Sequence, residues 1–232
     1  VPSPPPPRPP IDLTPALTAI FSGGAAFGTP VALQLPPDQP LTLSAFAFDA
    51  NITASEIRFV GAAGTILSAG ASGGGSGGRR ALSGLAADTT IFTISPGAPP
   101  VFLEGLTISG HIAVHGGTLD IANCTFDGTG LSGARALTVS GGAVTLRSSD
   151  LNDFDAGGMR VTDGEVRITG GVLTRNGRAP ASTFGGIEMV SPGGSLWLVG
   201  TTIEHNGRLS NSCDGGVCVR GGGLSVLGTS AT

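Results

Sequence analysis

Carboxylate side chains gather at one point of the sequence. Asp150, Asp153 and Asp155 follow one another closely, Asn152 lies between them, and Asp127 precedes them. Two carboxyl groups on neighbouring segments can act as general acid and general base on a glycosidic bond, or they can ligate Ca²⁺. The three aspartates at 150, 153 and 155 are therefore the candidate catalytic residues of a carbohydrate-active enzyme. A charged turn in solvent explains the same residues and is the favoured interpretation.

The histidines and cysteines offer little further chemistry. His111, His115 and His205 are expected at turns on the surface. No histidine lies near enough in sequence to the cysteines to complete a four-ligand set, so neither a metal nor another cofactor is predicted. Cys213 and Cys218 bracket a short loop and are predicted to form a disulfide, the alternative being two unrelated thiols. Cys124 is expected to be a small core residue.

Three positions suggest contact with carbohydrate. Asn51 and Asn123 begin the sequons Asn-Ile-Thr and Asn-Cys-Thr, and both are predicted N-glycosylation sites if the chain is secreted. Trp197 is expected to point outward, where it could stack on a sugar ring or simply pack on its neighbours.

Composition excludes several classes of protein. The formal net charge is −4, and the basic residues are all arginine with no basic stripe among aromatics, so no nucleic-acid partner is expected. No apolar stretch approaches the ~18–20 residues of a membrane span. Glycine reaches 40 residues while 40% of the chain is hydrophobic. Glycine therefore punctuates an apolar framework, which is unlike a disordered chain.

The region before residue 101 divides into two parts. Residues 1–10 are rich in proline and are predicted to form a polyproline II segment, because serial prolines fix φ and remove donors. Residues 11–100 are predicted to hold an N-terminal cap and the first irregular coils. Thr14 followed by Pro15 predicts the start of a short helix that ends near Ser22 and covers the first coil.

From residue 101 to residue 232 the chain repeats, and we expect it to continue beyond 232. Each unit has an alternating strand, a glycine corner, a second alternating strand, a turn and a third apolar residue. The second strands begin at Leu119, Val144, Val166, Leu196 and Leu224, at intervals of 22 to 30 residues. Alternation sends successive side chains inward and outward, so the spacing predicts an all-β parallel β-helix whose inward residues stack between coils. An antiparallel sandwich is the alternative, and the constant glycine corners disfavour it.

Two short patterns recur at the ends of these units. Gly157-Gly158-Met159, Gly185-Gly186-Ile187 and Gly215-Gly216-Val217 precede the first strand, and Leu173-Thr-Arg-Asn176 and Ile203-Glu-His-Asn206 follow the turn. They resemble the GGA[ILV] and FxxN marks of polymorphic-outer-membrane-protein-type repeats in the pectin-lyase-like superfamily, without the Ala and with an aliphatic residue for Phe. The resemblance implies a right-handed parallel β-helix, a fold that carries lyases, hydrolases, adhesins and structural proteins.

The N-terminus has a second resemblance. The segment Ser3-Pro4-Pro5-Pro6-Pro7 resembles the Ser-Pro4 unit of extensin-type, hydroxyproline-rich cell-wall glycoproteins. The resemblance implies glycosylation at Ser3 and at the hydroxylated residues Pro4, Pro5, Pro6 and Pro7. A proline-rich linker or a ligand for a protein module is the alternative.

These features together favour a non-catalytic structural or adhesive segment of an extracellular glycoprotein over an enzyme. We expect a secreted, cell-surface or matrix location, with self-association or with other surface proteins and glycans as partners. The alternatives are a polysaccharide lyase or glycoside hydrolase centred on Asp153, and a glycan-binding adhesin that uses Trp197.

Overall fold

The computed structural model describes residues 9–22, 28–37, 39–62, 64–70, 89–178, 185–190 and 193–207. It also describes the backbone of Val217–Val219, Gly223–Leu227 and Ser230–Ala231. The described chain is predominantly β-structure with one helix, as the alternating pattern predicts. The helix is neither long nor apolar enough to cross a membrane, and the described residues hold no other.

The chain starts with β1 and the helix α1 and then continues through β-strands alone. The elements are β1 Ile11–Asp12, α1 Thr14–Ser22, β2 Pro30–Leu35, β3 Leu41–Leu43, β4 Phe46–Phe48, β5 Glu56–Gly61, β6 Ile66–Ala69, β7 Thr90–Ile94, β8 Val101–Glu104, β9 Thr107–Ser109, β10 His111–Val114, β11 Thr118–Ala122, β12 Thr125–Asp127, β13 Leu137–Arg147, β14 Asp150–Asn152, β15 Met159–Thr169, β16 Val172–Thr174, β17 Ile187–Met189, β18 Ser195–Val199, β19 Thr202–Glu204, β20 Val217–Val219, β21 Gly223–Leu227 and β22 Ser230–Ala231.

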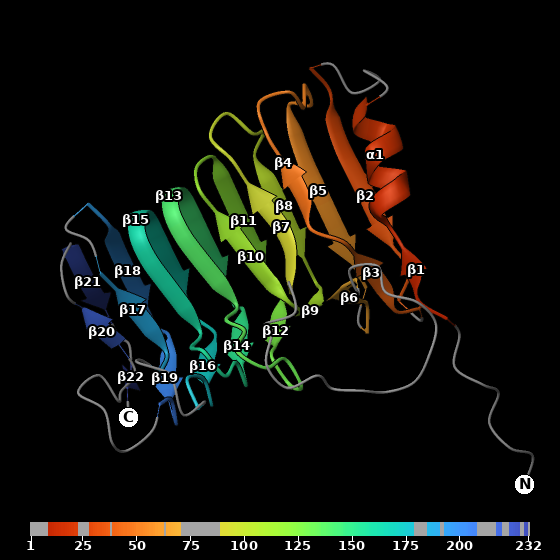
Figure 1. Cartoon of the computed structure of the whole chain (residues 1–232). Coiled ribbons are helices and arrows are strands. Elements are labelled where there is room, and N and C mark those ends of the chain that lie inside the picture. The colour runs from red at the N-terminus through yellow and green to blue at the C-terminus, as the bar shows by residue number, and fades with distance from the viewer. Residues whose placement is uncertain are drawn as a thin grey trace, which may run out of the picture.

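The strands form two sheets, and within the described residues neighbouring strands pair in parallel. One sheet runs β1-β3-β6-β9-β12-β14-β16-β19-β22, while the larger sheet holds the remaining strands. In the larger sheet β13 and β15 are long enough to span two rows, so β13 pairs with both β10 and β11. Figure 1 shows the strands stacked side by side along the molecule from β2 to β21. This topology is compatible with a β-helix or a related solenoid.

Strands before residue 101 pair in the same sheets as those after it. Strand β8 pairs with β5, and β10 pairs with β7. The strands of the N-terminal region therefore belong to the same stack as the regular repeats.

The apolar columns predicted from the repeats lie in register inside the molecule. Leu119 pairs with Val144, Val144 with Val166, and Val166 with Leu196. The apolar residues of the first strand and of the third position also stack: Ile112, Leu137, Met159 and Ile187, and then Phe126, Leu151, Leu173 and Ile203. All of these side chains are buried. Burial of each contributes about 1.5–3 kcal/mol relative to exposure, so the stacked columns hold the sheets together.

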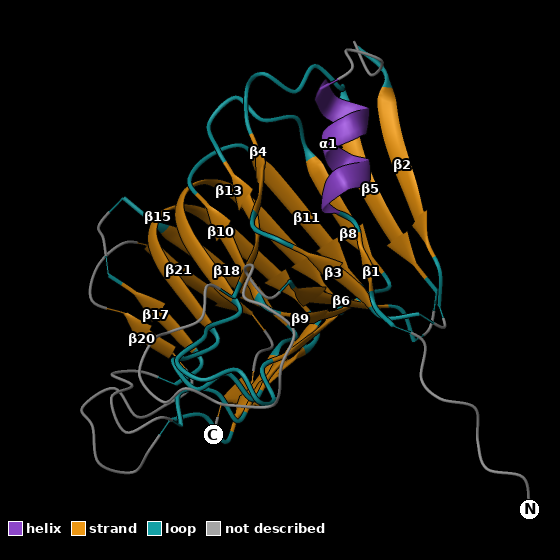
Figure 2. Ribbon diagram, turned by 45° about the vertical axis from the view of Figure 1, so that its right-hand side comes forward, coloured by secondary structure: helices purple, strands orange, loops and turns teal. Residues whose placement is uncertain are grey.

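The helix α1 covers the end of the stack, as predicted (Figure 2). Leu17 is fully buried. The centre of the Phe21 ring lies 6.0 Å from the centre of the Phe46 ring and 6.2 Å from that of Phe48. Thr14 is the first residue of α1, and its side chain bonds outside the helix. Its Oγ1 accepts a hydrogen bond from the Ser44 backbone N–H, which ties the helix to the first repeat.

The corners between the two strands of a repeat bring backbones into close contact. Gly142 has a φ of 79°, and a Cβ built on it would overlap the carbonyl oxygen of Gly117 one repeat earlier. A side chain therefore has no room at this corner, which explains the glycine that the repeat keeps there.

Candidate functional site

The predicted acidic turn lies at the end of β14, but its carboxylates have separate partners. Asp150 Oδ1 accepts a hydrogen bond of 2.8 Å from the backbone N–H of Val172 in the next repeat. Asp153 forms a two-point ion pair with Arg175, with Nε–Oδ1 2.8 Å and Nη2–Oδ2 2.7 Å. Asp155 is partly buried, and within the described part of the chain its side chain makes no hydrogen bond or ion pair. Two of the three candidates therefore join successive repeats.

Asp127, one repeat before this turn, also has a local partner. It pairs in register with Asn152, and its Oδ1 accepts the backbone N–H of Thr129 at 2.9 Å. Among the described residues no group of three His, Cys, Asp or Glu side chains is placed to hold a metal ion. The expectation for these residues was a charged turn in solvent, and the bonds made by Asp127, Asp150 and Asp153 give the turn a structural role as well.

Arg175 controls the ionisation of Asp153. Its hydrogen bonds and positive charge hold the pKa of the Asp153 carboxyl below its ordinary value, and partial burial opposes this only in part. A general acid needs a carboxyl that stays protonated near neutral pH, and Asp153 has the opposite tendency.

Two asparagines, the buried Asn176 and the half-buried Asn206, follow the same turn in the next repeats. The Asn176 amide donates to the Leu151 carbonyl at 2.8 Å and to Asn206 Oδ1 at 3.1 Å, while its own Oδ1 accepts the Phe154 backbone N–H at 3.1 Å. Asn206 donates in turn to the Leu173 carbonyl at 2.8 Å. The two asparagine side chains therefore stack across successive repeats.

The left-handed residues of this turn are not the asparagines. Residues with positive φ here are Asp153, Arg175 and His205, at 62°, 56° and 53°. The left-handed position therefore lies one residue before each of Asn176 and Asn206, and the asparagines serve to bond buried backbone groups instead.

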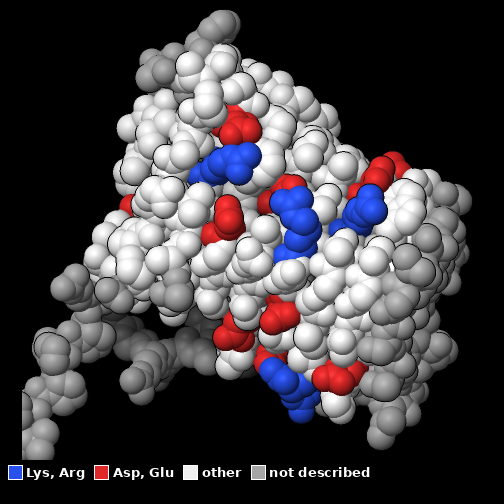
Figure 3. All heavy atoms as spheres, turned by 180° about the vertical axis from the view of Figure 1, so that it is seen from behind, with Lys and Arg blue, Asp and Glu red and all other residues white. Residues whose placement is uncertain are grey.

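Trp197 lies on the outward face of the second strands. Its strand neighbours Leu196 and Leu198 are buried, whereas Trp197 itself is only partly buried and pairs in register with the exposed Arg167 of β15. Positive and negative side chains are interspersed on this face (Figure 3). Some of these side chains form ion pairs, such as Arg147 Nη2 with Asp120 Oδ1 at 2.7 Å. The guanidinium of Arg58 lies 4.2 Å from the centre of the Phe102 ring.

A second polar group lies on the outward face of the first strands. His111 Nδ1 is 3.2 Å from Thr90 Oγ1, and His111 Nε2 is 3.0 Å from Thr138 Oγ1, so the ring joins three strands. Only part of this side chain is exposed, and His111 lies in strand β10 where a turn was expected. His115 and His205 are exposed as expected.

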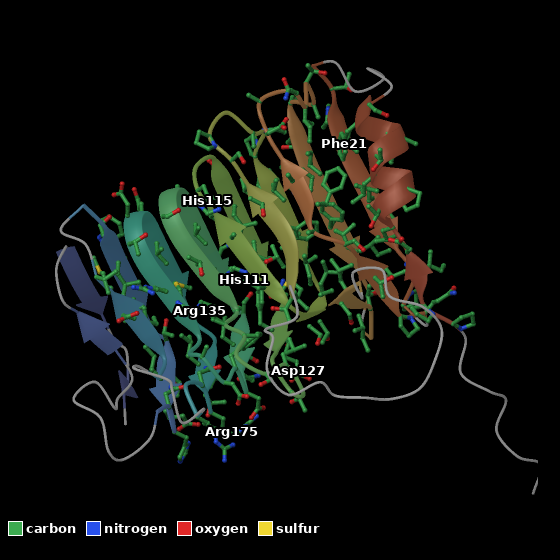
Figure 4. The ribbon with its side chains drawn as sticks, in the orientation of Figure 1. Phe21, His111, His115, Asp127, Arg135 and Arg175 are labelled. Atoms are coloured by element: carbon green, nitrogen blue, oxygen red, sulfur yellow. The ribbon has the colours of Figure 1, made fainter. Side chains whose placement is uncertain are left out.

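This polar row continues into a group of charges. Thr138 pairs in register with Arg160, and Arg160 pairs with Glu188. The Glu188 side chain is only 4% exposed, and its Oε2 lies 3.3 Å from Arg160 Nε. Arg135, in the segment before β13, interacts electrostatically with both, and burial is the main cause that lowers its pKa. Figure 4 shows Arg135 and His111 among the side chains of this region.

Only part of this charge group has a signal in the sequence. That signal is the pair of opposite charges, Arg160 and Glu188, at equivalent positions of two successive repeats. Arg135 lies in a connecting segment, and no periodic pattern indicates that this segment returns to the same face.

The remaining predicted sites lie at the surface, in the core or outside the described residues. Asn51 and Asn123 are both exposed, and Asn123 has a φ of 53° in the turn between β11 and β12; glycosylation at either stays a prediction. Cys124 is a buried free thiol, as expected for a core residue. Cys213, Ser3, Pro4, Pro5, Pro6 and Pro7 lie outside the described residues, as does the side chain of Cys218.

No protein-family model matches this chain, and no curated protein or solved structure matches it either.

Proposed function

We propose that this chain is a non-catalytic structural or adhesive segment of an extracellular glycoprotein, built as a right-handed parallel β-helix of the pectin-lyase-like type. The observation that carries the proposal is that polar side chains of the turns join successive repeats. Asp153 pairs with Arg175 across one repeat boundary, and Asn176 bonds Asn206 across the next. Acidic residues used in this way strengthen a stack of repeats.

The extracellular part of the proposal rests on the N-terminal proline segment and on the sequons. Both sequon asparagines are exposed, so a glycan on Asn51 or Asn123 would meet solvent. Mass spectrometry of the native protein should find glycans on Asn51, Asn123 or the prolines of residues 1–10, and electron microscopy should show filaments or a surface layer. An unmodified protein recovered from inside the cell would contradict the location.

A polysaccharide lyase or glycoside hydrolase is the alternative function. We expect no turnover of neutral or acidic polysaccharides in reducing-sugar and unsaturated-uronide assays. If turnover occurs, Asp153→Ala should be compared with Asp163→Ala, since Asp163 is an exposed carboxylate at a corner of the larger sheet. Activity abolished by the first substitution and retained by the second would overturn the structural assignment.

Glycan adhesion is the third candidate, and the partly exposed indole of Trp197 favours it. Because the chain has one tryptophan, its fluorescence reports on this position alone. Binding of a glycan at Trp197 should change the emission, and Trp197→Ala should weaken binding while Phe102→Ala, on the same face, should not.

A further inference from the structure

Three charged side chains lie near one another beside the first strands. Arg160 and Glu188 are register neighbours on β15 and β17, and Arg135 precedes β13. We call Arg135, Arg160 and Glu188 the arginine cluster.

The arginine cluster holds more positive than negative charge in a partly dehydrated place. It has two guanidinium groups and one carboxylate, and that carboxylate is almost completely buried. The positive charge of Arg160 adds to burial in making the charged form of Arg135 less favourable. An anion bound between the two guanidinium groups would reduce the repulsion between them. Charged groups held in such unfavourable surroundings are often found at binding sites.

The guanidinium of Arg160 also has N–H groups that can donate hydrogen bonds to a ligand. Its Nε faces Glu188 and is buried, with no hydrogen bond of good geometry in the described part of the chain. The side chain as a whole is 41% exposed, and its one recorded ion pair among the described residues uses Nε. The two terminal nitrogens are therefore the part of the guanidinium that can meet a ligand from solvent. A guanidinium presents its N–H groups as a planar fork that suits the oxygens of a carboxylate or a sulfate.

We propose that the arginine cluster is a binding site for an oxyanion, a carboxylate or sulfate group, in which Arg160 and Arg135 supply the positive charge and Glu188 positions Arg160. This site goes beyond the structural role proposed above and does not depend on it. The same oxyanion chemistry occurs in free inorganic ions and in charged groups carried on a polymer.

The test uses the whole chain and measures binding by calorimetry and by the rise in melting temperature. The probes are sodium sulfate and sodium acetate, each compared with sodium chloride at equal ionic strength, and dextran sulfate compared with neutral dextran. Arg160→Gln should weaken sulfate binding by about tenfold or more, because it removes both the charge and the fork. Arg160→Lys, which keeps the charge, should weaken it less.

Two further variants separate this site from general electrostatic attraction. Glu188→Gln removes the competing negative charge with little change of shape, so it should leave anion affinity equal or several-fold tighter. Arg147→Gln removes an arginine from another face, where it pairs with Asp120, and should leave affinity unchanged.

Each outcome decides the proposal. Binding of free sulfate lost in Arg160→Gln and retained in Arg147→Gln supports a site for small anions. Binding of dextran sulfate alone with the same variant pattern supports a site for a polymer-borne oxyanion. The proposal would be overturned if sulfate and acetate bind no better than chloride. It would also be overturned if Arg160→Gln and Arg147→Gln lose equal affinity for the anion. If Arg160→Gln fails to fold, the comparison of Arg160→Lys with Glu188→Gln gives the same decision.

Discussion

Asp153 and Arg175 occupy the same left-handed turn position in consecutive repeats, and their side chains join in a two-point ion pair with both contacts below 3 Å. Both residues adopt a positive φ, a conformation that non-glycine residues rarely take. The pair links two turns whose backbones are already in register through Asp153 N–H and the Thr174 carbonyl.

This ion pair should make stability depend on pH in the acid range. Because Arg175 lowers the pKa of Asp153, the folded state binds its proton less tightly than the unfolded chain does. The stabilisation is therefore complete above the unfolded pKa of about 4 and is lost as the pH falls through the lower folded value. Urea melts of wild type and Asp153→Asn between pH 7 and pH 2 should show a difference that shrinks below about pH 4.

A control for this titration is Asp155→Asn, since no partner is recorded for Asp155 in the described structure. Its effect on stability should be smaller and should not follow the same pH profile. A constant difference between wild type and Asp153→Asn down to pH 2 would contradict the assigned role. Because the pair is partly exposed, added salt should reduce its contribution.

Asn176 should be among the most sensitive polar residues of the stack. Asn176→Ala leaves the Phe154 N–H and the Leu151 carbonyl without their partners inside the molecule, and each such loss costs about 1–3 kcal/mol. Chemical denaturation should show a loss of roughly 2–5 kcal/mol. Asn152→Ala is the matched control, because the Oδ1 of Asn152 has no hydrogen-bond partner in the described structure, and it should cost much less.

Glycine at the repeat corner can be tested against a glycine with the same backbone angle. Gly142 and Gly130 have φ values of 79° and 80°, but a Cβ on Gly130 meets nothing within 4 Å. Gly130→Ala should therefore show only the cost of the left-handed backbone, about 1–2 kcal/mol. Gly142→Ala should add the overlap with Gly117 and cost clearly more, as measured by melting temperature. Equal costs would show that the corner has room for a side chain.

Cys124 should be an unreactive thiol. Burial raises its pKa to about 11, so few thiolates form at pH 8. In a variant with Cys213 and Cys218 replaced by serine, a thiol reagent should react slowly in the native state and fast in denaturant. Rapid native labelling would contradict burial at this position.

Replacement of Cys124 by serine should nevertheless be tolerated. The thiol donates to the Ala122 carbonyl at 3.3 Å, and Ser149 at the equivalent position donates to the Arg147 carbonyl at 2.8 Å. A serine hydroxyl can therefore make the same bond, and Cys124→Ser should change stability by less than about 1 kcal/mol. Cys124→Leu should be strongly destabilising, because the added volume has no space in a packed turn.

Much of the architecture could be predicted from the spacing of residues alone. Alternation and glycine corners place Leu119, Val144, Val166 and Leu196 in one column, because period-two side chains with a constant offset can be buried together only if the strands stack in register. The cap over the first repeat also follows from local signals, since Thr14, Pro15 and the glycines after Ser22 mark the ends of a helix.

Tertiary structure decided which polar residues come together. Asp153 looked like a candidate acid in the sequence, and only the stacking of turns shows that Arg175 of the next repeat neutralises it. Arg135 lies in a connecting segment without periodicity, so its approach to Arg160 and Glu188 depends on the path of that segment over the sheet. The sequence by itself determined the columns, because burial follows a short repeating pattern. The partners of charged side chains are set by distances between segments that are far apart in the chain, and these distances exist only once the chain has folded.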